Sequence, residues 1–312
     1  MRDTILFGDC RKTLCAFLPQ SARTCVTSPP YYGLRDYGGE DNQIGQEQTP
    51  EEYIEQMVQV FREVRNVLTD DGTLWVNIGD SYYNYRPGSK AYVKQTVSKT
   101  NPDLPEYSPK RSTKLDGLKE KDLIGIPWMF AFAMRADGWY LRQDIIWHKP
   151  NPMPESVRDR CTKSHEYIFL FSKNKKYFYD NEAIKEPAKD WGTRDRTNGK
   201  YHNKGTGLQP HSGLTKSYAK KNKRSVWSVT KKPYKGAHFA VFPPELIEPC
   251  ILAGSEKGDT ILDPFMGSGT TAMVAKKLDR HYIGCELHEN YGNLIEERIS
   301  PYTNTLEQFY EE

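Results

Sequence analysis

Apolar and polar residues alternate with the period of an α-helix between residues 49 and 68. The apolar positions lie three or four residues apart and form one stripe: Tyr53, Met57, Val60, Phe61, Val64 and Leu68. Thr49 is a suitable N-cap, Pro50 fits the first turn, and Glu52 completes a capping box. We therefore predict a helix that begins at Pro50 and ends before Gly72, with its stripe in the core.

Short apolar runs of strand length alternate with helical segments along most of the chain. The predicted strands are residues 5–7, 24–27, 73–78, 139–147, 167–172, 260–263 and 281–286. Further helices are predicted at residues 126–134, 243–253 and 270–278. Alternating strands and helices are typical of a mainly parallel sheet with helices on both faces, so the pattern predicts an α/β fold.

Changes in composition divide the chain into five segments. Three of them carry the regular pattern: residues 1–83, residues 122–182 and residues 236–312. Residues 84–121 contain few apolar side chains, and we predict a mobile excursion from the core there. Residues 183–235 hold 14 Lys and Arg but only three Asp and Glu, so their net charge is +11 although the whole chain carries only +3. Such a local excess favours a polyanionic partner, with a solvated basic loop as the alternative.

Composition excludes several classes of protein. The 312 residues are 37% hydrophobic and 27% charged, which suffices for a folded core. No run approaches the roughly 18 apolar residues that cross a membrane, and the first residues lack the apolar core of a signal peptide. The six cysteines include no Cys-x-x-Cys pair, which argues against a zinc ribbon or a disulfide framework. We expect a protein of the reducing cytoplasm with no metal site.

A glycine-rich turn lies between the predicted strand that ends at Asp263 and the helix that starts near Thr270. Gly267 and Gly269 permit a tight turn and a close approach of the backbone to a ligand. Glu286 ends the next predicted strand, where nucleotide-binding folds place a carboxylate against ribose hydroxyls. The arrangement predicts a nucleoside-containing cofactor; the alternative is a structural turn with acidic neighbours.

Two features of this turn distinguish between cofactors. Only 26 residues follow Glu286, so a sheet that starts at Asp263 must be completed by strands from the N-terminal half, in a circularly permuted order. The carboxylate of Asp263 would repel a pyrophosphate but attract the cationic methionine part of S-adenosylmethionine. We therefore expect S-adenosylmethionine rather than a dinucleotide.

The turn Ser28-Pro29-Pro30-Tyr31 follows another predicted strand. The two prolines stiffen the turn and leave their carbonyl oxygens as acceptors, Ser28 adds a hydroxyl, and Tyr31 offers a flat ring. Such groups suit a planar base with an exocyclic amine, held by acceptors and stacked on the tyrosine. Since a base inside a duplex cannot reach such a pocket, it must be flipped out. The alternative is a tight proline turn with a buried tyrosine.

These motifs together resemble the DNA amino-methyltransferases of the β arrangement, in which the catalytic motif precedes the cofactor motif. Ser28-Pro29-Pro30-Tyr31 matches the family's catalytic motif, and the segment from Asp263 to Thr271 matches its glycine-rich cofactor motif. The segments 147–151 and 164–167 match a further part of the family pattern. The resemblance implies a Rossmann-like methyltransferase fold in which residues 183–235 form the target-recognition insert.

The resemblance also implies roles for single residues. It assigns catalysis to Ser28, Pro29, Pro30 and Tyr31. It assigns cofactor binding to Asp9 at the adenine, Glu286 at the ribose, Phe239 and Pro243 in the segment that closes over the methionine, and the turn residues Asp263, Phe265, Gly267, Gly269, Thr270 and Thr271. His148 and His165 are expected to be structural or to contact phosphate rather than to act as general bases.

The first residue of the catalytic motif bears on the target base. Family members with Ser at this position tend to modify the 4-amino group of cytosine, although some modify the 6-amino group of adenine. Methylation at ring carbon 5 needs a nucleophilic Cys in a Pro-Cys turn. The one Pro-Cys pair, Pro249-Cys250, lies in a predicted helix. We favour cytosine, with adenine as the alternative.

Three other functions compete with DNA methylation. A methyltransferase of RNA or of a protein amide uses similar proline turns, but there the cofactor motif usually comes first. A non-catalytic DNA-binding module and a nicotinamide-dependent oxidoreductase fit the intact motifs and their order less well. The expected partner is double-stranded DNA, with a second copy of the chain and a cognate restriction endonuclease as further candidates.

Overall fold

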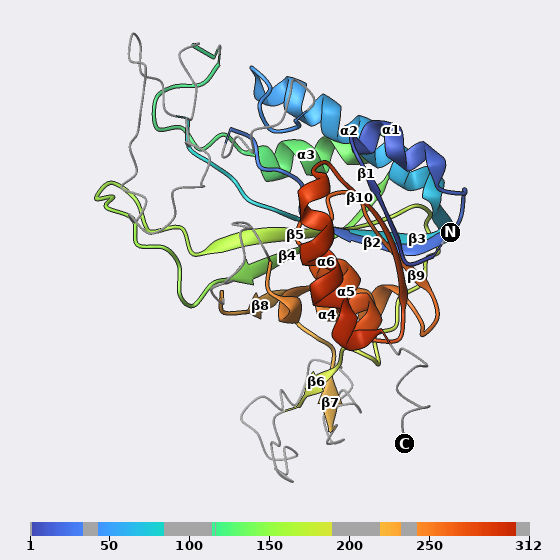
Figure 1. Cartoon of the computed structure of the whole chain (residues 1–312). Helices are drawn as coiled ribbons and strands as arrows, with labels where there is room; N and C mark the ends of the chain where they lie inside the picture. Colours follow the sequence, from blue (N-terminus) through green and yellow to red (C-terminus); the bar gives the residue numbers. More distant parts are fainter. Residues whose placement is uncertain are drawn as a thin grey trace, which may run out of the picture.

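The computed structural model describes residues 2–33, 43–83, 114–115, 117–188, 219–231 and 242–303. Its centre is a sheet whose strands lie in the order β1-β10-β9-β2-β3-β5-β4-β8 (Figure 1). The strands are β1 (Thr4–Phe7), β2 (Ala22–Thr27), β3 (Leu68–Ile78), β4 (Tyr140–His148), β5 (His165–Ser172), β8 (Val226–Ser228), β9 (Thr260–Asp263) and β10 (His281–Glu286). Of these strands only β5 runs antiparallel to its neighbours, so the predicted mainly parallel sheet is confirmed.

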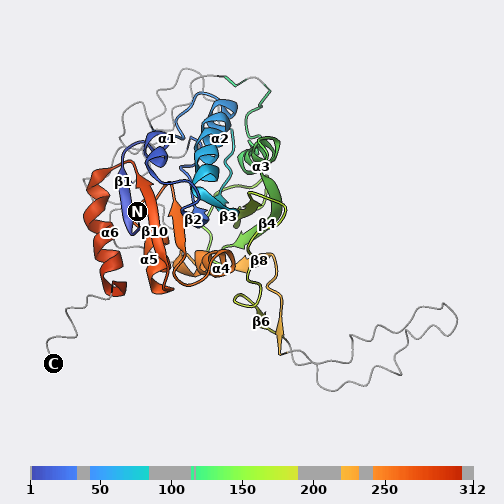
Figure 2. The same ribbon diagram turned by 90° about the vertical axis from the view of Figure 1, so that its right-hand side faces the viewer.

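Helices cover both faces of this sheet, as Figure 2 shows. One face carries α1 (Cys10–Thr13), α2 (Pro50–Val67) and α3 (Ile126–Ala136), and the other carries α4 (Pro244–Gly254), α5 (Thr270–Lys277) and α6 (Gly292–Ile299). Alternate residues of a strand point to opposite faces. Thus Leu74 of β3 packs into the core with α2 and α3, while its neighbour Trp75 packs into the core with α4.

The chain is circularly permuted, as the sequence predicted. Strand β2 from the N-terminal part pairs with β9 from the C-terminal part, with Thr24 opposite Ile261 and Cys25 opposite Leu262. The two strands are parallel, so their carboxyl ends lie at the same edge of the sheet. The chain continues from β2 to α2 on one face of the sheet and from β9 to α5 on the other face. Open α/β sheets bind their ligands at such a switch point.

The predicted start of α2 is confirmed and its predicted end is wrong. Thr49 accepts a hydrogen bond from the N–H of Glu52, whose side chain in turn accepts from the N–H of Thr49. The helix ends at Val67, because Leu68 already pairs with Ala22 as the first residue of β3. Gly72 therefore lies inside the strand, where a Cβ would come within 3.1 Å of the Arg23 carbonyl oxygen.

The two segments predicted to lie outside the regular core, 183–235 and 84–121, are each described only in part. The predicted target-recognition region contributes the edge strand β8 to the main sheet, and it also contains both strands of a small sheet, β6 (Glu186–Pro187) and β7 (Lys220–Lys221). The predicted excursion at 84–121 lies mostly outside the described residues. Among the described residues, none of the helices has the length and apolar character that a membrane span requires.

Replacing Thr49 by Ala is expected to lower the free energy of unfolding by about 1 kcal/mol, because the N–H of Glu52 loses its acceptor. Thr49→Ser keeps the oxygen and is expected to remain close to the wild type. Urea unfolding followed by circular dichroism measures both. Equal losses in the two variants would show that the hydroxyl does not cap the helix.

Candidate active site

The two predicted motifs meet at the carboxyl edge of the sheet. Thr27, the last residue of β2, donates a 2.6 Å hydrogen bond from its hydroxyl to Oδ1 of Asp263, the last residue of β9. Thr271, in the first turn of α5, donates to the other carboxylate oxygen at 2.6 Å and lies 3.2 Å from the carbonyl oxygen of Val26. The Ser-Pro-Pro-Tyr and glycine-rich turns are thus joined by one buried group of side chains.

Asp263 is almost fully buried, at 1% exposure. Burial raises its pKa to about 6, although the hydrogen bonds from Thr27, Thr271 and the N–H of Phe265 act in the opposite direction. Charging such a carboxyl is unfavourable unless a cation lies nearby. The site therefore has a carboxyl whose ionisation near neutral pH depends on what binds beside it.

The glycine-rich turn is tightly packed against its neighbours. Gly267 and Gly269 have positive φ angles of 54° and 79°, a conformation that glycine adopts without strain. A Cβ on Gly269 would lie 2.9 Å from a methyl of Ile295 in α6. The hydroxyl of Thr270 accepts a hydrogen bond from Arg298, which also contacts Ser268. The structure thus gives Thr270 and Thr271 contacts that fix the turn itself.

Glu286 holds the other side of this turn. Its carboxylate accepts hydrogen bonds from the N–H of Gly267 at 2.7 Å and from that of His288 at 3.0 Å. Burial raises the pKa of Glu286, while these N–H groups act against the rise. Since β10 pairs with β9, the carboxylates of Glu286 and Asp263 follow neighbouring strands.

Asp9 follows the next strand, β1, which pairs with β10 so that Phe7 lies opposite Glu286. The Asp9 side chain accepts from the N–H of Arg11 and caps α1, and it also pairs with the Arg11 guanidinium at 2.8 Å. Burial acts to raise the pKa of Asp9, but the hydrogen bonds from Arg11 outweigh it, so the pKa is lowered. Three carboxylates therefore follow three adjacent parallel strands.

Two predicted cofactor residues come from the segment before α4. Pro243 is buried and forms the N-cap of that helix. Phe239 lies outside the described residues. Phe265, in the glycine-rich turn, is partly buried against the core under α2.

The Ser-Pro-Pro-Tyr turn differs from the prediction at one carbonyl. The carbonyl oxygen of Pro30 accepts a 2.9 Å hydrogen bond from the hydroxyl of Tyr53 in α2, so it is not the unpaired acceptor that the sequence predicted. Tyr53 belongs to the apolar stripe of the helix, and its ring is buried while its hydroxyl supports the turn. The hydroxyl of Ser28 also interacts with the phenol of Tyr31, so the first and last residues of the turn are in contact.

Tyr31 is held by side chains that the sequence analysis assigned no role. Its hydroxyl lies 2.8 Å from a carboxylate oxygen of Glu166, at the start of β5, and 3.3 Å from the amide oxygen of Asn77 in β3. The other oxygen of Glu166 pairs with Lys149, which follows β4. Lys149 and Glu166 lie in the segments 147–151 and 164–167, which match the family pattern, and this was the available signal. The pairing of β4 with β5, which brings both residues toward Tyr31, could not be read from the sequence.

The charge states of this group follow from burial and mutual contact. Burial, and then the charge of Glu166, raise the pKa of Tyr31 well above its usual value, so the phenol stays protonated and donates. Burial alone would raise the pKa of Glu166, but Lys149 and the phenol lower it. Burial lowers the pKa of Lys149 to about 8 against the opposing effect of Glu166. At neutral pH the group is a protonated phenol, a carboxylate and an ammonium.

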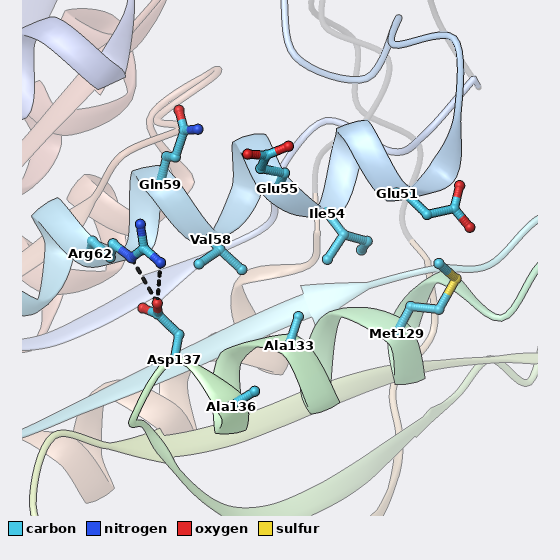
Figure 3. A pocket seen from close by; sticks show the side chains of 10 residues that line it. All are labelled: Glu51, Ile54, Glu55, Val58, Gln59, Arg62, Met129, Ala133, Ala136 and Asp137. Carbon is cyan, nitrogen blue, oxygen red and sulfur yellow. Dashed lines mark hydrogen bonds and ion pairs between the residues drawn. The ribbon is translucent and has the colours of Figure 1, made fainter.

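A groove between α2 and α3 lies apart from this edge (Figure 3). Apolar side chains line its floor, and the ion pair between Arg62 and Asp137 closes one end. None of the predicted site residues lines it, so it is not where the two motifs act. Among the described residues, no cluster of His, Cys, Asp or Glu has the arrangement of a metal site.

Comparison with known proteins agrees with this geometry. Residues 22–297 match the family model described as DNA methylase. The type II methyltransferase M.SmaI of Serratia marcescens is 48% identical over 295 residues, which cover 95% of this chain and 90% of that protein. The type II methyltransferase M.XycI of Xanthomonas campestris pv. cyanopsidis is 46% identical over 303 residues, or 96% and 88% of the two chains.

Solved structures share the fold at lower identity. The PvuII DNA methyltransferase, described as cytosine-N4-specific, superposes with a TM-score of 0.62 at 18% identity and covers 96% of this chain and 86% of its own. A DNA modification methylase of Thermus thermophilus, solved with S-adenosyl-L-methionine, gives 0.59 at 22% identity and covers 97% and 95%. The chain therefore belongs to the DNA methylase family of N4 and N6 amino-methyltransferases, which use S-adenosylmethionine.

Proposed function

We propose that this protein methylates the exocyclic 4-amino group of cytosine in double-stranded DNA, after the base has been flipped out of the helix. The observation that carries the proposal is the hydrogen bond between Thr27 and Asp263. It places the turn that suits an aromatic amine directly beside the turn that suits a nucleoside cofactor. The same reaction on the 6-amino group of adenine is the second candidate.

The residues at the carboxyl edge fit S-adenosylmethionine by the chemistry of their donor set. The carboxylate of Glu286 is oriented by two backbone N–H groups and suits ribose hydroxyls, while Asp9 follows the next strand, toward the adenine. Asp263 supplies the negative charge for the methionine part, and Gly267 and Gly269 let the backbone approach. When bound, the cofactor supplies a methyl group on a positively charged sulfur.

The catalytic turn positions the base. We assign to the Ser28 hydroxyl and the Pro29 carbonyl the two hydrogens of the substrate amine, and to the Tyr31 ring the stacking contact. Acceptors that hold both hydrogens out of the ring plane direct the nitrogen lone pair away from the ring, toward the cofactor side. No strong base is required, because a methylated amino group that carries a positive charge loses its proton readily.

The preference for cytosine rests on Ser28. An uncharged hydroxyl at the first motif position is more frequent in the cytosine-specific members of the family. The PvuII enzyme is described as having the same specificity, although a likeness at 18% identity supports only the fold. Adenine remains the alternative, because some adenine-specific members also use Ser.

The basic residues of the segment 183–235 suit the DNA backbone. Lys220, Lys221 and Lys223 lie around β7, and Lys231 follows β8 beside the catalytic edge, where its backbone N–H bonds to Asn151. Glu186 pairs with Lys221 and Lys223, so one carboxylate offsets only part of their charge. Lys and Arg here would neutralise phosphates and release counterions.

The relatives' name, type II methyltransferase, supports a place in a restriction–modification system. The partner would be an endonuclease that cuts the same sequence when it is unmethylated. Action on chromosomal DNA implies a cytoplasmic enzyme. A homodimer is a further proposal, which sedimentation of the purified protein would test.

The reaction product gives the direct test. Duplex DNA incubated with the protein and S-adenosylmethionine, then digested to nucleosides, is expected to contain N4-methylcytosine by mass spectrometry. Tyr31→Ala is expected to reduce its formation by about 100-fold or more, because the base loses its stacking surface. N6-methyladenine would overturn the assignment of the base, and no methylated nucleoside across DNA of varied sequence would overturn the function.

The pKa of Asp263 predicts how cofactor binding depends on pH. Its pKa of about 6 means that most Asp263 side chains are protonated at pH 5 and must ionise to attract a cationic ligand. Affinity for S-adenosylmethionine, measured by calorimetry, is therefore expected to be roughly tenfold weaker at pH 5 than at pH 7.5.

Asp263→Asn is expected to bind weakly at both pH values and to lose this dependence. Glu286→Gln, which removes the carboxylate of the neighbouring strand, serves as the matched control and should retain it. An unchanged pH dependence in Asp263→Asn would assign the effect to another group.

A further inference from the structure

The buried group formed by Tyr31, Glu166, Lys149 and Asn77 is larger than the proposed chemistry requires. Glu166 accepts from the phenol of Tyr31 at 2.8 Å and from the amide of Asn77 at 3.3 Å, and its second oxygen pairs with Lys149. The side chains of Lys149 and Glu166 are only 8% and 15% exposed. These residues come from β3, β5 and the end of β4, so three strands converge on one phenol.

Lys149 is fixed from two directions. Its ammonium pairs with Glu166 and also lies 4.4 Å from the centre of the Trp147 ring. The indole N–H of Trp147 in turn donates to the carbonyl oxygen of Val229 at 2.9 Å. A buried ion pair adds little net stability, because desolvation offsets the attraction between the charges. Stability alone therefore does not explain this pair.

The ring of Tyr31 is also confined by its neighbour Gly79. A Cβ at this position would lie 2.7 Å from Cε2 of the ring, so the backbone of Gly79 packs directly against it. The side chain is therefore restrained at two places, at its hydroxyl by Glu166 and along one edge of its ring by Gly79.

Glu166 does not have the features of a general base. Its two oxygens already accept from a phenol, an amide and an ammonium. Removing a proton from a substrate would require one of these donors to leave. Its contacts instead act on Tyr31, the residue to which the proposed function gives the stacking contact.

We propose that Glu166 and Lys149 are positioning residues that set the orientation of the Tyr31 ring, and so the position of the flipped base relative to the cofactor. The inference rests on the proposed function. Lys149 orients the carboxylate, the carboxylate holds the phenol, and the ring is thereby oriented for stacking on the base. Loss of any link leaves the base bound but poorly aligned, a defect that lowers kcat more than it weakens binding.

The test is a double-mutant cycle between Tyr31→Phe, which removes only the phenol oxygen, and Glu166→Met, which keeps the length of the side chain but removes the acceptor of the phenol. Each single variant is expected to lower kcat about tenfold, and the double variant is expected to lose no more than either one, because both break the same link. KM for DNA and the Kd for S-adenosylmethionine should stay within about twofold. Losses of kcat that multiply in the double variant, or no loss of kcat in the single variants, would overturn the inference.

A second readout separates positioning from folding. DNA that carries fluorescent pyrrolocytosine at the methylated position reports whether the base has left the helix and on what it stacks. The variants are expected to flip this base with altered fluorescence, while their melting temperature matches that of Tyr31→Phe. Lys149→Met tests the contact between the lysine and the carboxylate of Glu166. Unaltered fluorescence in Glu166→Met, or loss of kcat only in proportion to lost folded protein, would contradict a positioning role.

Lys257→Met is the matched control for the lysine. Lys257 pairs with Asp279 in an exposed ion pair near the amino end of β9, at the other edge of the sheet, so its replacement should leave kcat unchanged.

The outcome of the double-mutant cycle also distinguishes the positioning role from the proposed function. If the wild type methylates no base, the proposed function fails; if it methylates DNA and the cycle is additive, only the positioning role fails.

Discussion

The pairing of β2 with β9 is the contact on which the rest of the molecule depends. These strands come from opposite ends of the chain, and side by side they bring Thr27 against Asp263. Without this pairing the Ser-Pro-Pro-Tyr turn and the glycine-rich turn would be separate loops. With it, the two turns lie side by side at one edge of the sheet, joined through the buried carboxyl of Asp263.

Charge is arranged along that edge in a consistent order. Carboxylates follow β1, β10 and β9, where a cationic cofactor with ribose hydroxyls would bind. On the other side of β2, the carboxylate of Glu166 lies among the ammonium groups of Lys149 and Lys231, while the Ser-Pro-Pro-Tyr turn itself contains no charged residue. The sheet order therefore places the carboxylates on one side of β2 and the lysines on the other.

Much of the fold followed from local patterns. The capping box at Thr49 and the apolar stripe of α2 are properties of consecutive residues, and the structure contains both. The end of α2 was predicted wrongly, because Leu68 continues the helical period but is drawn into β3 by its pairing with Ala22. Pairing between strands is a non-local contact, and no periodicity within the helix contains that information.

The sequence by itself determined the fold class, the circular permutation and the two motifs, because each depends on residues near one another in the chain or on the order of segments. Only the tertiary structure decided which groups serve the site. Tyr53 binds the carbonyl of Pro30 from a helix that begins 20 residues later, and Glu166 binds Tyr31 from 135 residues away. Such partners are selected by strand order and helix packing, and their residue types alone do not identify them.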